Sequence, residues 1–377
     1  MGLGSWKRRG RRTLVAAALT TTIVAGTAGW ASGHEQRPLT GPPPGTASWR
    51  ADDTLGRALP DPEAVGPSHM AAFFRGLSAT DQHELAVRHP SVVGNLDGAP
   101  IPLRYEANAL ALRAEKTRAR GEARNATLTP RARAAARDLA ERCADLLARG
   151  RRILAFDPRG RGQVAEVYGD LRSARHVSVV VPGSDIDLGS FDRTTKDVYG
   201  TPAGMAKSLY AAARGRTAVV AWVGYTTPVG LGPDAATGRL AEAGAPRLAR
   251  FAQGLRAAGT PKPTVFCHSY GSVVCGLAAS RLPASDLVVF GSPGLRANSV
   301  SDLHTRARVW AARDDSDWIA KVPHVELLGL GHGADPTDPS FGARRVPAER
   351  AQGHTGYFAP GTDSLRAFTD IAIGASS

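Results

Sequence analysis

The sequence has few cysteines and no metal-binding motif. Its 377 residues include only Cys143, Cys267 and Cys275, and they contain neither a Cys-x-x-Cys nor a His-Glu-x-x-His arrangement. A metal centre therefore has no support in the sequence, and we expect neither a metal nor a cofactor. Three cysteines make no complete disulfide framework, so we expect Cys267 and Cys275 to stay free and to pack as small apolar side chains.

Aromatic residues are scarce where the basic residues gather. The chain has a formal net charge of +13, and most of the excess lies in residues 1–40 and 104–152. The second segment holds 13 basic residues but only one aromatic residue, Tyr105. Surfaces that bind nucleic acids interleave basic and aromatic side chains. We therefore predict no nucleic-acid partner and interpret residues 104–152 as a solvated, arginine-rich helical surface.

Charge is also absent from one long segment near the N-terminus. A basic stretch from Trp6 to Arg12 precedes 21 uncharged residues, Thr13 to Gly33. This order is typical of an export signal, and we assign residues 1–33 to a signal peptide or membrane anchor. Cleavage after Ala31 and retention as a weak anchor both fit, since about 20 residues span a bilayer. In either case we expect the protein to be exported, either secreted or anchored at the outer face of the cell membrane.

The remaining chain divides into three parts by composition. Residues 34–60 include three consecutive prolines and are predicted to be an extended linker. Residues 61–151 carry helix-start signals such as Ser78-Ala-Thr-Asp81 and Thr129-Pro130. Residues 152–377 contain short apolar runs separated by helical or turn-rich segments, at 153–156, 164–168, 177–181, 218–223, 265–267, 287–290 and 309–312. This α/β pattern predicts a mostly parallel sheet covered by helices on both faces, with the ligand site at the carboxyl ends of the strands.

The central motif is a serine between a strand and a helix. Thr264–Cys267 reads as a buried strand, and apolar residues after Tyr270 recur at helical spacing. Ser269 between them, with Gly271 two residues on, has the context of a nucleophile elbow. Cys267 stands where a glycine is usual, so the turn must form without a glycine on that side. The competing interpretation is an ordinary turn whose serine caps the helix.

A nucleophilic serine needs a base and a carboxylate that orients the base. In this kind of fold the acid and then the histidine follow the serine along the chain. His354, in a glycine-flanked loop before the last predicted helix, is the expected base, and His332 is the alternative. His268 adjoins the serine and is expected to face away. Asp317 is the expected acid, with Asp314 and Asp315 as alternatives in the same turn.

Backbone N–H groups must also stabilise the oxyanion that forms during acyl transfer. One donor is expected from Tyr270, directly after the nucleophile. The other is expected from Ser184, in the Pro182-Gly-Ser-Asp185 loop after the strand at 177–181. Trp222 and Tyr225, at the end of the next strand, are expected to line an apolar substrate pocket.

Several stretches together resemble a family of actinobacterial, mostly exported α/β-hydrolases of largely uncharacterised activity. These stretches are Asn95-Leu-Asp-Gly-Ala-Pro100, Tyr105-Glu-Ala-Asn108, Val180-Val-Pro-Gly183, His268-Ser-Tyr-Gly-Ser272, Phe290-Gly-Ser-Pro-Gly294, Asp317-Trp-Ile319, Gly331-His-Gly-Ala-Asp-Pro336, Phe341-Gly-Ala-Arg344 and His354 with Tyr357-Phe358. The resemblance runs from about residue 70 to the C-terminus. It implies the α/β-hydrolase fold over 152–377, a helical N-terminal region over 61–151, and a Ser269–Asp317–His354 triad. It supplies no substrate.

These observations predict an exported serine hydrolase that cleaves a carboxylic ester, or less favourably an amide, through an acyl-enzyme on Ser269. The expected partner is a small or lipid-like ester, with membrane association through the N-terminal segment. A peptidase of the same fold is one alternative. A catalytically inactive binding or envelope protein is the other.

Overall fold

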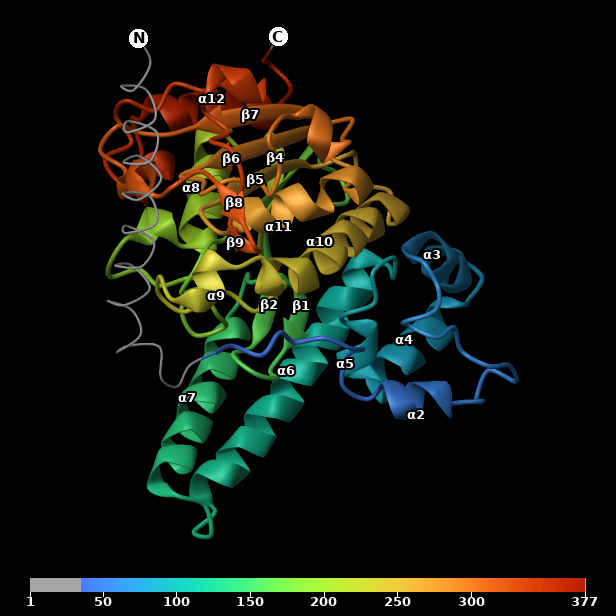
Figure 1. Ribbon diagram of the computed structural model, residues 1–377. Helices are drawn as coiled ribbons and strands as arrows, with labels where there is room; N and C mark the ends of the chain where they lie inside the picture. Colours follow the sequence, from blue (N-terminus) through green and yellow to red (C-terminus); the bar gives the residue numbers. More distant parts are fainter. Residues whose placement is uncertain (1–34, 377) are drawn as a thin grey trace, which may run out of the picture.

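The computed structural model describes residues 35–376, which are built around one eight-stranded sheet (Figure 1). The strands are β1 (Ile153–Asp157), β2 (Gln163–Tyr168), β3 (His176–Val181), β4 (Thr217–Val223), β5 (Thr264–His268), β6 (Asp286–Phe290), β7 (Arg308–Ala312) and β10 (Arg344–Arg345). Their order across the sheet is β1-β2-β4-β3-β5-β6-β7-β10. The pairs β1–β2 and β2–β4 are antiparallel, and all other pairs are parallel. The predicted mostly parallel sheet is therefore confirmed.

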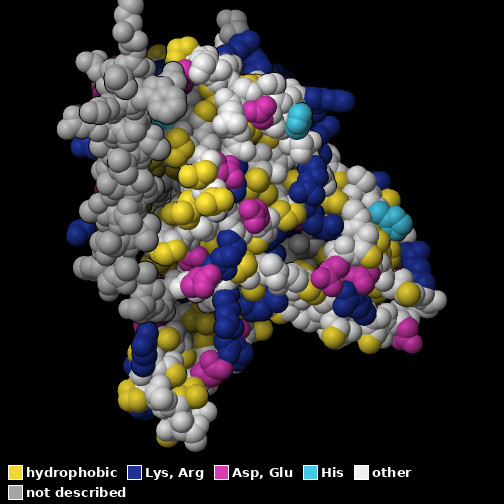
Figure 2. Space-filling model, viewed as in Figure 1, with side chains coloured by type: hydrophobic (Ala, Val, Ile, Leu, Met, Phe, Trp, Pro, Cys, Tyr) yellow, Lys and Arg dark blue, Asp and Glu magenta, His cyan; other side chains and the backbone are white. Residues whose placement is uncertain are grey.

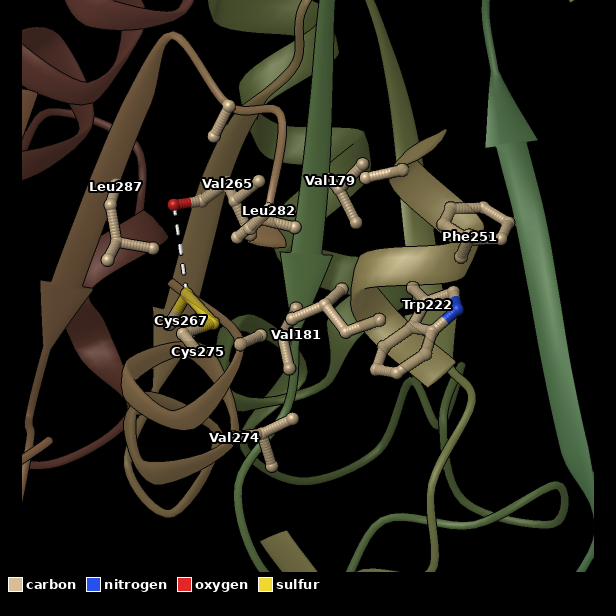
Figure 3. Close-up of a cluster of buried hydrophobic side chains, with 14 of the residues drawn as sticks. Val179, Val181, Trp222, Phe251, Val265, Cys267, Val274, Cys275, Leu282 and Leu287 are labelled. Carbon is tan, nitrogen blue, oxygen red and sulfur yellow. Dashed lines mark hydrogen bonds between the residues drawn. A yellow bond between two sulfur atoms is a disulfide. The ribbon is translucent and has the colours of Figure 1, made fainter. Parts of the chain in front are cut away.

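Helices cover both faces of the sheet because the centres of its strands are mostly apolar and successive side chains point to opposite sides. The main helices of this part are α8 (Pro202–Ala212), α10 (Arg239–Ala257), α11 (Gly271–Ala278) and α12 (Asp363–Ala372). Val179, Val265 and Leu287 belong to one core cluster with residues of α10 and α11. Figure 3 shows part of this cluster, with Phe251 of α10 beside Trp222 of β4. Val180, Phe266 and Val288 face the other way and pack with residues of α8 and α12.

The N-terminal region is helical, as predicted. Its helices are α2 (Thr46–Arg50), α3 (Pro67–Arg75), α4 (Ala79–Arg88), α5 (Pro90–Val93), α6 (Ile101–Arg124) and α7 (Pro130–Leu146). The side chains of Ser78 and Thr129 accept backbone hydrogen bonds and cap α4 and α7, which is why those helices begin where the sequence indicates. In Figure 1, α6 and α7 form a long hairpin that projects from the body.

Two asparagines join this region to the edge strand β1. The Asn95 side chain donates to the carbonyl of Phe156 at 2.7 Å and accepts from the Phe156 N–H at 3.1 Å. The Asn108 side chain donates to the carbonyl of Ile153 at 3.2 Å. An unpaired sheet edge invites pairing with other chains, so these contacts help to cover it.

Residues 46–60 differ from the extended linker that the sequence predicts. They contain α2, and Trp49 is fully buried with its indole N–H donating to the carbonyl of Pro60 at 2.8 Å. Trp49 packs in a small third core with residues such as Phe74 and Leu85. The proline-rich composition indicated an extended linker, but the burial of Trp49 and Leu59 in this core fixes the segment to the helical region.

The remaining elements are short. They are α9 (Pro233–Ala236), the hairpin of β8 (Glu326–Leu327) and β9 (Leu330–Gly331), and the 3-10 turns η1 (Val198–Gly200), η2 (Ala279–Arg281), η3 (Ser301–Leu303), η4 (Trp318–Lys321), η5 (Pro339–Phe341) and η6 (Gly356–Phe358). The export signal predicted at residues 1–33 lies outside the described residues. Between residues 35 and 376, none of the helices is long and apolar enough to cross a membrane.

Candidate active site

Ser269 lies in a sharp turn between β5 and α11. Its φ is +52°, a left-handed backbone conformation that is unusual for a residue with a side chain. A Cβ atom on Gly271 would lie 2.5 Å from the carbonyl oxygen of Pro182, so only glycine fits there. The N-cap of α11 is Tyr270, and no side chain caps this helix. Ser269 therefore does not act as the helix cap that the competing interpretation requires.

His354 and Asp317 lie in line with the serine. His354 Nε2 is 2.9 Å from Ser269 Oγ, and His354 Nδ1 is 2.8 Å from Asp317 Oδ1. Because an ionised carboxylate only accepts hydrogen bonds, Nδ1 carries the proton that it donates to Asp317. In the neutral ring, Nε2 is then free to accept the hydroxyl proton of Ser269. The residues come from the loops after β5, after β7 and before α12.

The carboxylate of Asp317 is held by several donors. Its side chain is fully buried and also accepts the Ile319 N–H at 2.9 Å and the Tyr357 hydroxyl at 2.6 Å. Burial by itself would raise the pKa of Asp317, but the hydrogen bond and charge of His354, together with the Tyr357 and Ile319 hydrogen bonds, outweigh it. The net result is a pKa below the ordinary value, so Asp317 stays ionised.

The alternative residues lie elsewhere. Asp314 is buried but accepts hydrogen bonds from the Ser316 N–H and hydroxyl, as a turn-capping aspartate does, while Asp315 is exposed. His332 places Nε2 2.7 Å from the carbonyl of Ala235. Among the alternatives weighed from the sequence, the structure thus brings Asp317 and His354 to Ser269.

His268 does not face away, which corrects the sequence-based expectation. It is buried, and its Nε2 donates to the backbone carbonyl of His354 at 2.7 Å. Its ring stacks on Phe290, with centroids 5.0 Å apart. Burial is the main reason that its pKa falls to about 3, and the nearby His354 lowers it further. A neutral His268 therefore fixes the backbone of the proposed base.

Two aromatic residues beside the triad were not singled out from the sequence as site residues. Tyr357 donates to Asp317 and its hydroxyl accepts the Asp314 N–H at 3.1 Å, which ties the acid to the loop of His354. Trp318 lies beside His354, with the two rings tilted by 44° and their centroids 4.6 Å apart. Trp318 directly follows Asp317, and Tyr357 lies three residues after His354. Their closeness in the sequence to these two site residues could have identified them as candidates.

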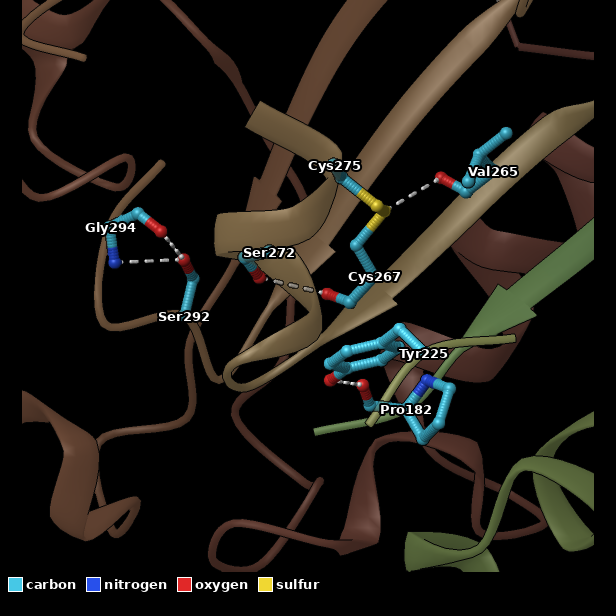
Figure 4. Close-up of a disulfide and its surroundings, with 8 residues drawn as sticks. All are labelled: Pro182, Tyr225, Val265, Cys267, Ser272, Cys275, Ser292 and Gly294. Carbon is cyan, nitrogen blue, oxygen red and sulfur yellow. Dashed lines mark hydrogen bonds between the residues drawn. A yellow bond between two sulfur atoms is a disulfide. The ribbon is translucent and has the colours of Figure 1, made fainter. Parts of the chain in front are cut away.

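The loop after β3 approaches the serine closely. A Cβ atom on Gly183 would lie 2.5 Å from Ser269 Cβ, so a side chain at 183 would collide with the nucleophile. The buried hydroxyl of Tyr225 donates to the Pro182 carbonyl at 2.7 Å and holds this loop (Figure 4). Within residues 35–376, the backbone N–H groups of Ser184 and Tyr270 have no hydrogen-bond partner.

Trp222 and Tyr225 are both buried, and they line different cavities. Trp222 lines a cavity of about 460 Å³ together with Phe251, Arg247 and residues of the N-terminal region. The lining of that cavity does not include Ser269, Asp317 or His354. Tyr225 instead stacks between Trp222 and Tyr270, with centroid distances of 6.2 and 6.5 Å. Its position supports the loop of Gly183.

Cys267 and Cys275 form a disulfide, so the expectation of two free thiols is wrong (Figure 4). Cys267 lies in β5 and Cys275 in α11, and the turn at Ser269 folds the helix back on the strand until the two Cα atoms are 6.5 Å apart. The odd third cysteine, Cys143, is free and buried. Counting cysteines could not find this pair, because it depends on the sharpness of one turn.

No group of three or more His, Cys, Asp or Glu side chains in residues 35–376 is arranged to hold a metal ion. The polar residues of the candidate site are instead connected to one another in a single hydrogen-bonded line. Ser269 and His354 remain partly accessible, whereas Asp317 is enclosed. The arrangement can pass a proton from the serine to the histidine while the carboxylate stays charged.

Residues 157–327 match the family model described as alpha/beta hydrolase. Uncharacterized protein Rv2079 of Mycobacterium tuberculosis is 27% identical over 371 residues, covering 83% of this chain and 56% of its own length. Uncharacterized protein Mb0988c of Mycobacterium bovis is 34% identical over 161 residues, covering 40% and 58%. The chain thus spans little more than half the length of these relatives.

Two solved structures show a weaker likeness. A predicted CIB-like hydrolase from Thermoplasma acidophilum gives a TM-score of 0.34 at 15% identity, covering 59% of this chain and 95% of its own. A member of the a/b serine hydrolases without lid from Xanthomonas campestris gives a TM-score of 0.34 at 15% identity, covering 60% and 94%. The sheet order agrees with the family match, and the chain therefore has an α/β-hydrolase fold, while the relatives named above are uncharacterized proteins.

Proposed function

We propose that this protein is a serine hydrolase that cleaves carboxylic esters through an acyl-enzyme on Ser269. The observation that carries the proposal is the hydrogen-bonded line from Ser269 Oγ through His354 to Asp317, at 2.9 and 2.8 Å. The strained turn that presents Ser269 supports it further, because such strain persists where the surrounding structure over-determines it, and it is often found at functional sites.

The reaction begins when Ser269 Oγ attacks the ester carbonyl carbon and its proton passes to His354 Nε2. Asp317 stabilises the imidazolium that forms and keeps Nδ1 protonated. The carbonyl oxygen becomes an oxyanion, and the free N–H groups of Ser184 and Tyr270 would bind it. When the intermediate collapses, the alcohol leaves with the proton from His354, and the acyl group stays on Ser269 as an ester.

The second half regenerates the enzyme. A water molecule gives its proton to His354 and attacks the acyl carbon, and the same two N–H groups bind the new oxyanion. The C–O bond to Ser269 then breaks, the proton returns to Oγ, and the carboxylic acid leaves. Every proton transfer in both halves uses His354 Nε2, so no further acid or base is needed. An alkoxide is a far better leaving group than an amide anion, so an ester needs less help from His354 than an amide does, and for that reason we propose an ester in preference to an amide.

We also propose that the protein is exported. Its disulfide supports this location, since disulfides persist in oxidising compartments outside the cytoplasm. The uncharged run at residues 13–33 after a basic stretch supports it independently. Fractionation of cells that express the whole chain tests the proposal. Protein confined to the soluble cytoplasmic fraction, with reduced cysteines, would contradict it.

Labelling with a fluorophosphonate probe, followed by peptide mapping, tests the enzymatic proposal. The probe reacts with an activated serine, and we expect the label on the peptide that contains Ser269. Ser269→Ala should abolish labelling and the hydrolysis of short-chain aryl esters without changing the melting temperature, because it removes one hydroxyl group. A folded protein that is never labelled and hydrolyses no ester would favour the binding-protein alternative.

A further inference from the structure

The exposed apolar side chains of this protein gather on one surface. Eight large apolar side chains are exposed within residues 35–376, and all but Val87 come from residues 229–231 and 318–330. We call these seven side chains the apolar rim: Val229, Leu231, Trp318, Val325, Leu327, Leu328 and Leu330. Leu327 and Leu328, at the turn of the β8–β9 hairpin, are 70% and 95% exposed. Such clustering marks an interaction surface, whereas single exposed apolar residues are ordinary.

The two segments of the rim lie side by side. A backbone bridge joins Leu330 of β9 to Thr237, which directly follows α9, and Leu231 lies just before α9. The hairpin itself is fixed by Arg296, whose guanidinium pairs with Glu326 at 2.6 Å. Figure 2 shows the yellow side chains gathered over the region where Figure 1 places β8 and β9. The hairpin and the segment before α9 are therefore adjoining parts of the rim.

This surface borders the proposed catalytic residues on two sides. At one end of the hairpin segment, Trp318 lies against the ring of His354. At the other end, His332 follows β9 and packs edge-on against Tyr270, with ring centroids 5.5 Å apart. Tyr270 is the residue next to Ser269. Whatever covers the rim at Trp318 therefore lies beside His354, the proposed base.

The first described residues also reach this surface. Gln36 N–H donates to Asp234 of α9 at 2.7 Å, and Glu35 pairs with Arg239 at 3.2 Å. The uncharged run of the sequence, residues 13–33, ends two positions before Glu35. The chain therefore joins its longest uncharged segment to the folded part beside α9, next to Leu231. An uncharged run that precedes residues bound beside an apolar surface favours a membrane as the environment of that surface.

We propose that the apolar rim docks on a lipid bilayer and that Leu327 and Leu328 insert into its surface. The substrate that we infer from this docking rests on the proposed ester hydrolysis. It is an ester carried in a membrane, and this ester enters the site beside Trp318. A bilayer fits better than a second copy of the chain, because the most exposed leucines project from a hairpin turn, and Glu35 and Gln36, which follow the uncharged run in the sequence, contact residues beside the same side. The inserted leucines would hold the site at the depth of the lipid ester bonds.

A fluorophore at the hairpin turn tests this docking directly. Cys143 is buried and the other two cysteines are paired, so Leu328→Cys adds the one accessible thiol in the described chain. The full chain, labelled there with an environment-sensitive nitrobenzoxadiazole group, is mixed with vesicles of equimolar phosphatidylethanolamine and phosphatidylglycerol. We expect the emission to shift to shorter wavelength and to increase. The same label at Val87→Cys, on α4, should not respond.

Kinetics with two presentations of an ester supply the second test. Leu327→Gln together with Leu328→Gln should lower kcat/KM about tenfold for a long-chain ester in these vesicles, since each leucine loses its apolar burial. Hydrolysis of a soluble short-chain ester should not change, and Val87→Gln, 50% exposed, should alter neither rate. These variants touch no residue of the triad.

The outcomes separate the two proposals. A label at 328 that stays silent while the protein sediments with vesicles would overturn the docking proposal. A response without vesicles that grows with protein concentration would overturn it too, in favour of self-association. If the label inserts but the wild type hydrolyses neither ester, docking stands and the proposed hydrolysis fails. The Ser269→Ala variant should insert as the wild type does.

Discussion

His268 donates a hydrogen bond from Nε2 to the backbone carbonyl of His354 at 2.7 Å, and the two rings lie 4.7 Å apart. His268, which directly precedes Ser269, therefore holds the main chain of His354, the proposed base. The bond needs no charge on His268, and burial keeps its ring neutral, with a pKa of about 3 instead of 6.5. Because Asp317 holds the other end of the ring, His354 is positioned by its side chain and by its backbone.

This relationship predicts a specific pH dependence of stability. Between about pH 3 and 6.5 the unfolded chain binds a proton at His268 that the folded chain does not, so acid favours unfolding. One such proton changes the free energy of unfolding by about 1.4 kcal/mol per pH unit. His268→Gln keeps a donor but removes the titration, and its stability should fall less steeply from pH 6.5 to 5. Urea unfolding at several pH values measures the slope, and equal slopes for variant and wild type would refute the explanation.

The close approach of Gly183 to Ser269 predicts that the site tolerates no side chain at position 183. In Gly183→Ala the new methyl carbon would lie 2.5 Å from Ser269 Cβ and 3.0 Å from Oγ, so the loop or the serine must shift. A shift of about 1 Å can cost on the order of 100-fold in rate. We expect that loss in kcat for a soluble ester with little change in the melting temperature. Gly66→Ala is the matched control, since a Cβ there meets no atom within 4 Å. Full activity in Gly183→Ala would show that the loop is not held as described.

The sequence predicts the fold because most strands contain a short apolar run, and it predicts the position of Ser269 because a strand, a turn and a helix follow one another directly. Only the apolar residues Trp318 and Ile319, which directly follow Asp317 in the sequence, favour Asp317 over Asp314 and Asp315. Whether a side chain faces the site was harder to predict: His268 was expected to point away, and only the turn geometry aims it at His354. The buried Trp49 shows the same limit, because composition does not reveal which apolar residue finds a partner.

The disulfide between Cys267 and Cys275 predicts a redox dependence of stability. The crosslink spans a sequence separation of 8 and restricts the unfolded chain. A loop of this length is worth about 2.5 kcal/mol in the chain-entropy model. Urea unfolding of the wild type should therefore shift to lower urea when a reductant is present. The double variant Cys267→Ala with Cys275→Ala should be less stable from the start and should not respond to reductant. A wild type that does not respond either would mean that the bond is absent in solution.

Asp317 and Asp315 lie two positions apart in one turn, and they allow a sharp test of the proposed acid. Asp317 is enclosed and accepts from His354, Tyr357 and Ile319, whereas Asp315 is exposed. In Asp317→Asn an amide would face Nδ1, and the ring would lose the carboxylate that fixes its tautomer. Loss of such an aspartate in a serine protease lowers kcat by about 10⁴ while the geometry stays intact, and we expect a loss of that order here. Asp315→Asn should keep the wild-type rate.

The pKa of Asp317 adds a second readout to that comparison. Because its folded pKa lies below the ordinary value of 3.8, the ionised carboxylate stabilises the fold above pH 3.8, and this contribution is lost as the pH falls through the lower, folded value. Asp317→Asn removes that titration, so its stability should depend less on pH in this acid range than that of Asp315→Asn. Ester hydrolysis and acid unfolding of the two variants measure both effects. If Asp317→Asn keeps near-full activity while Asp315→Asn or Asp314→Asn loses it, the acid is reassigned and the hydrogen bond from His354 to Asp317 is structural only.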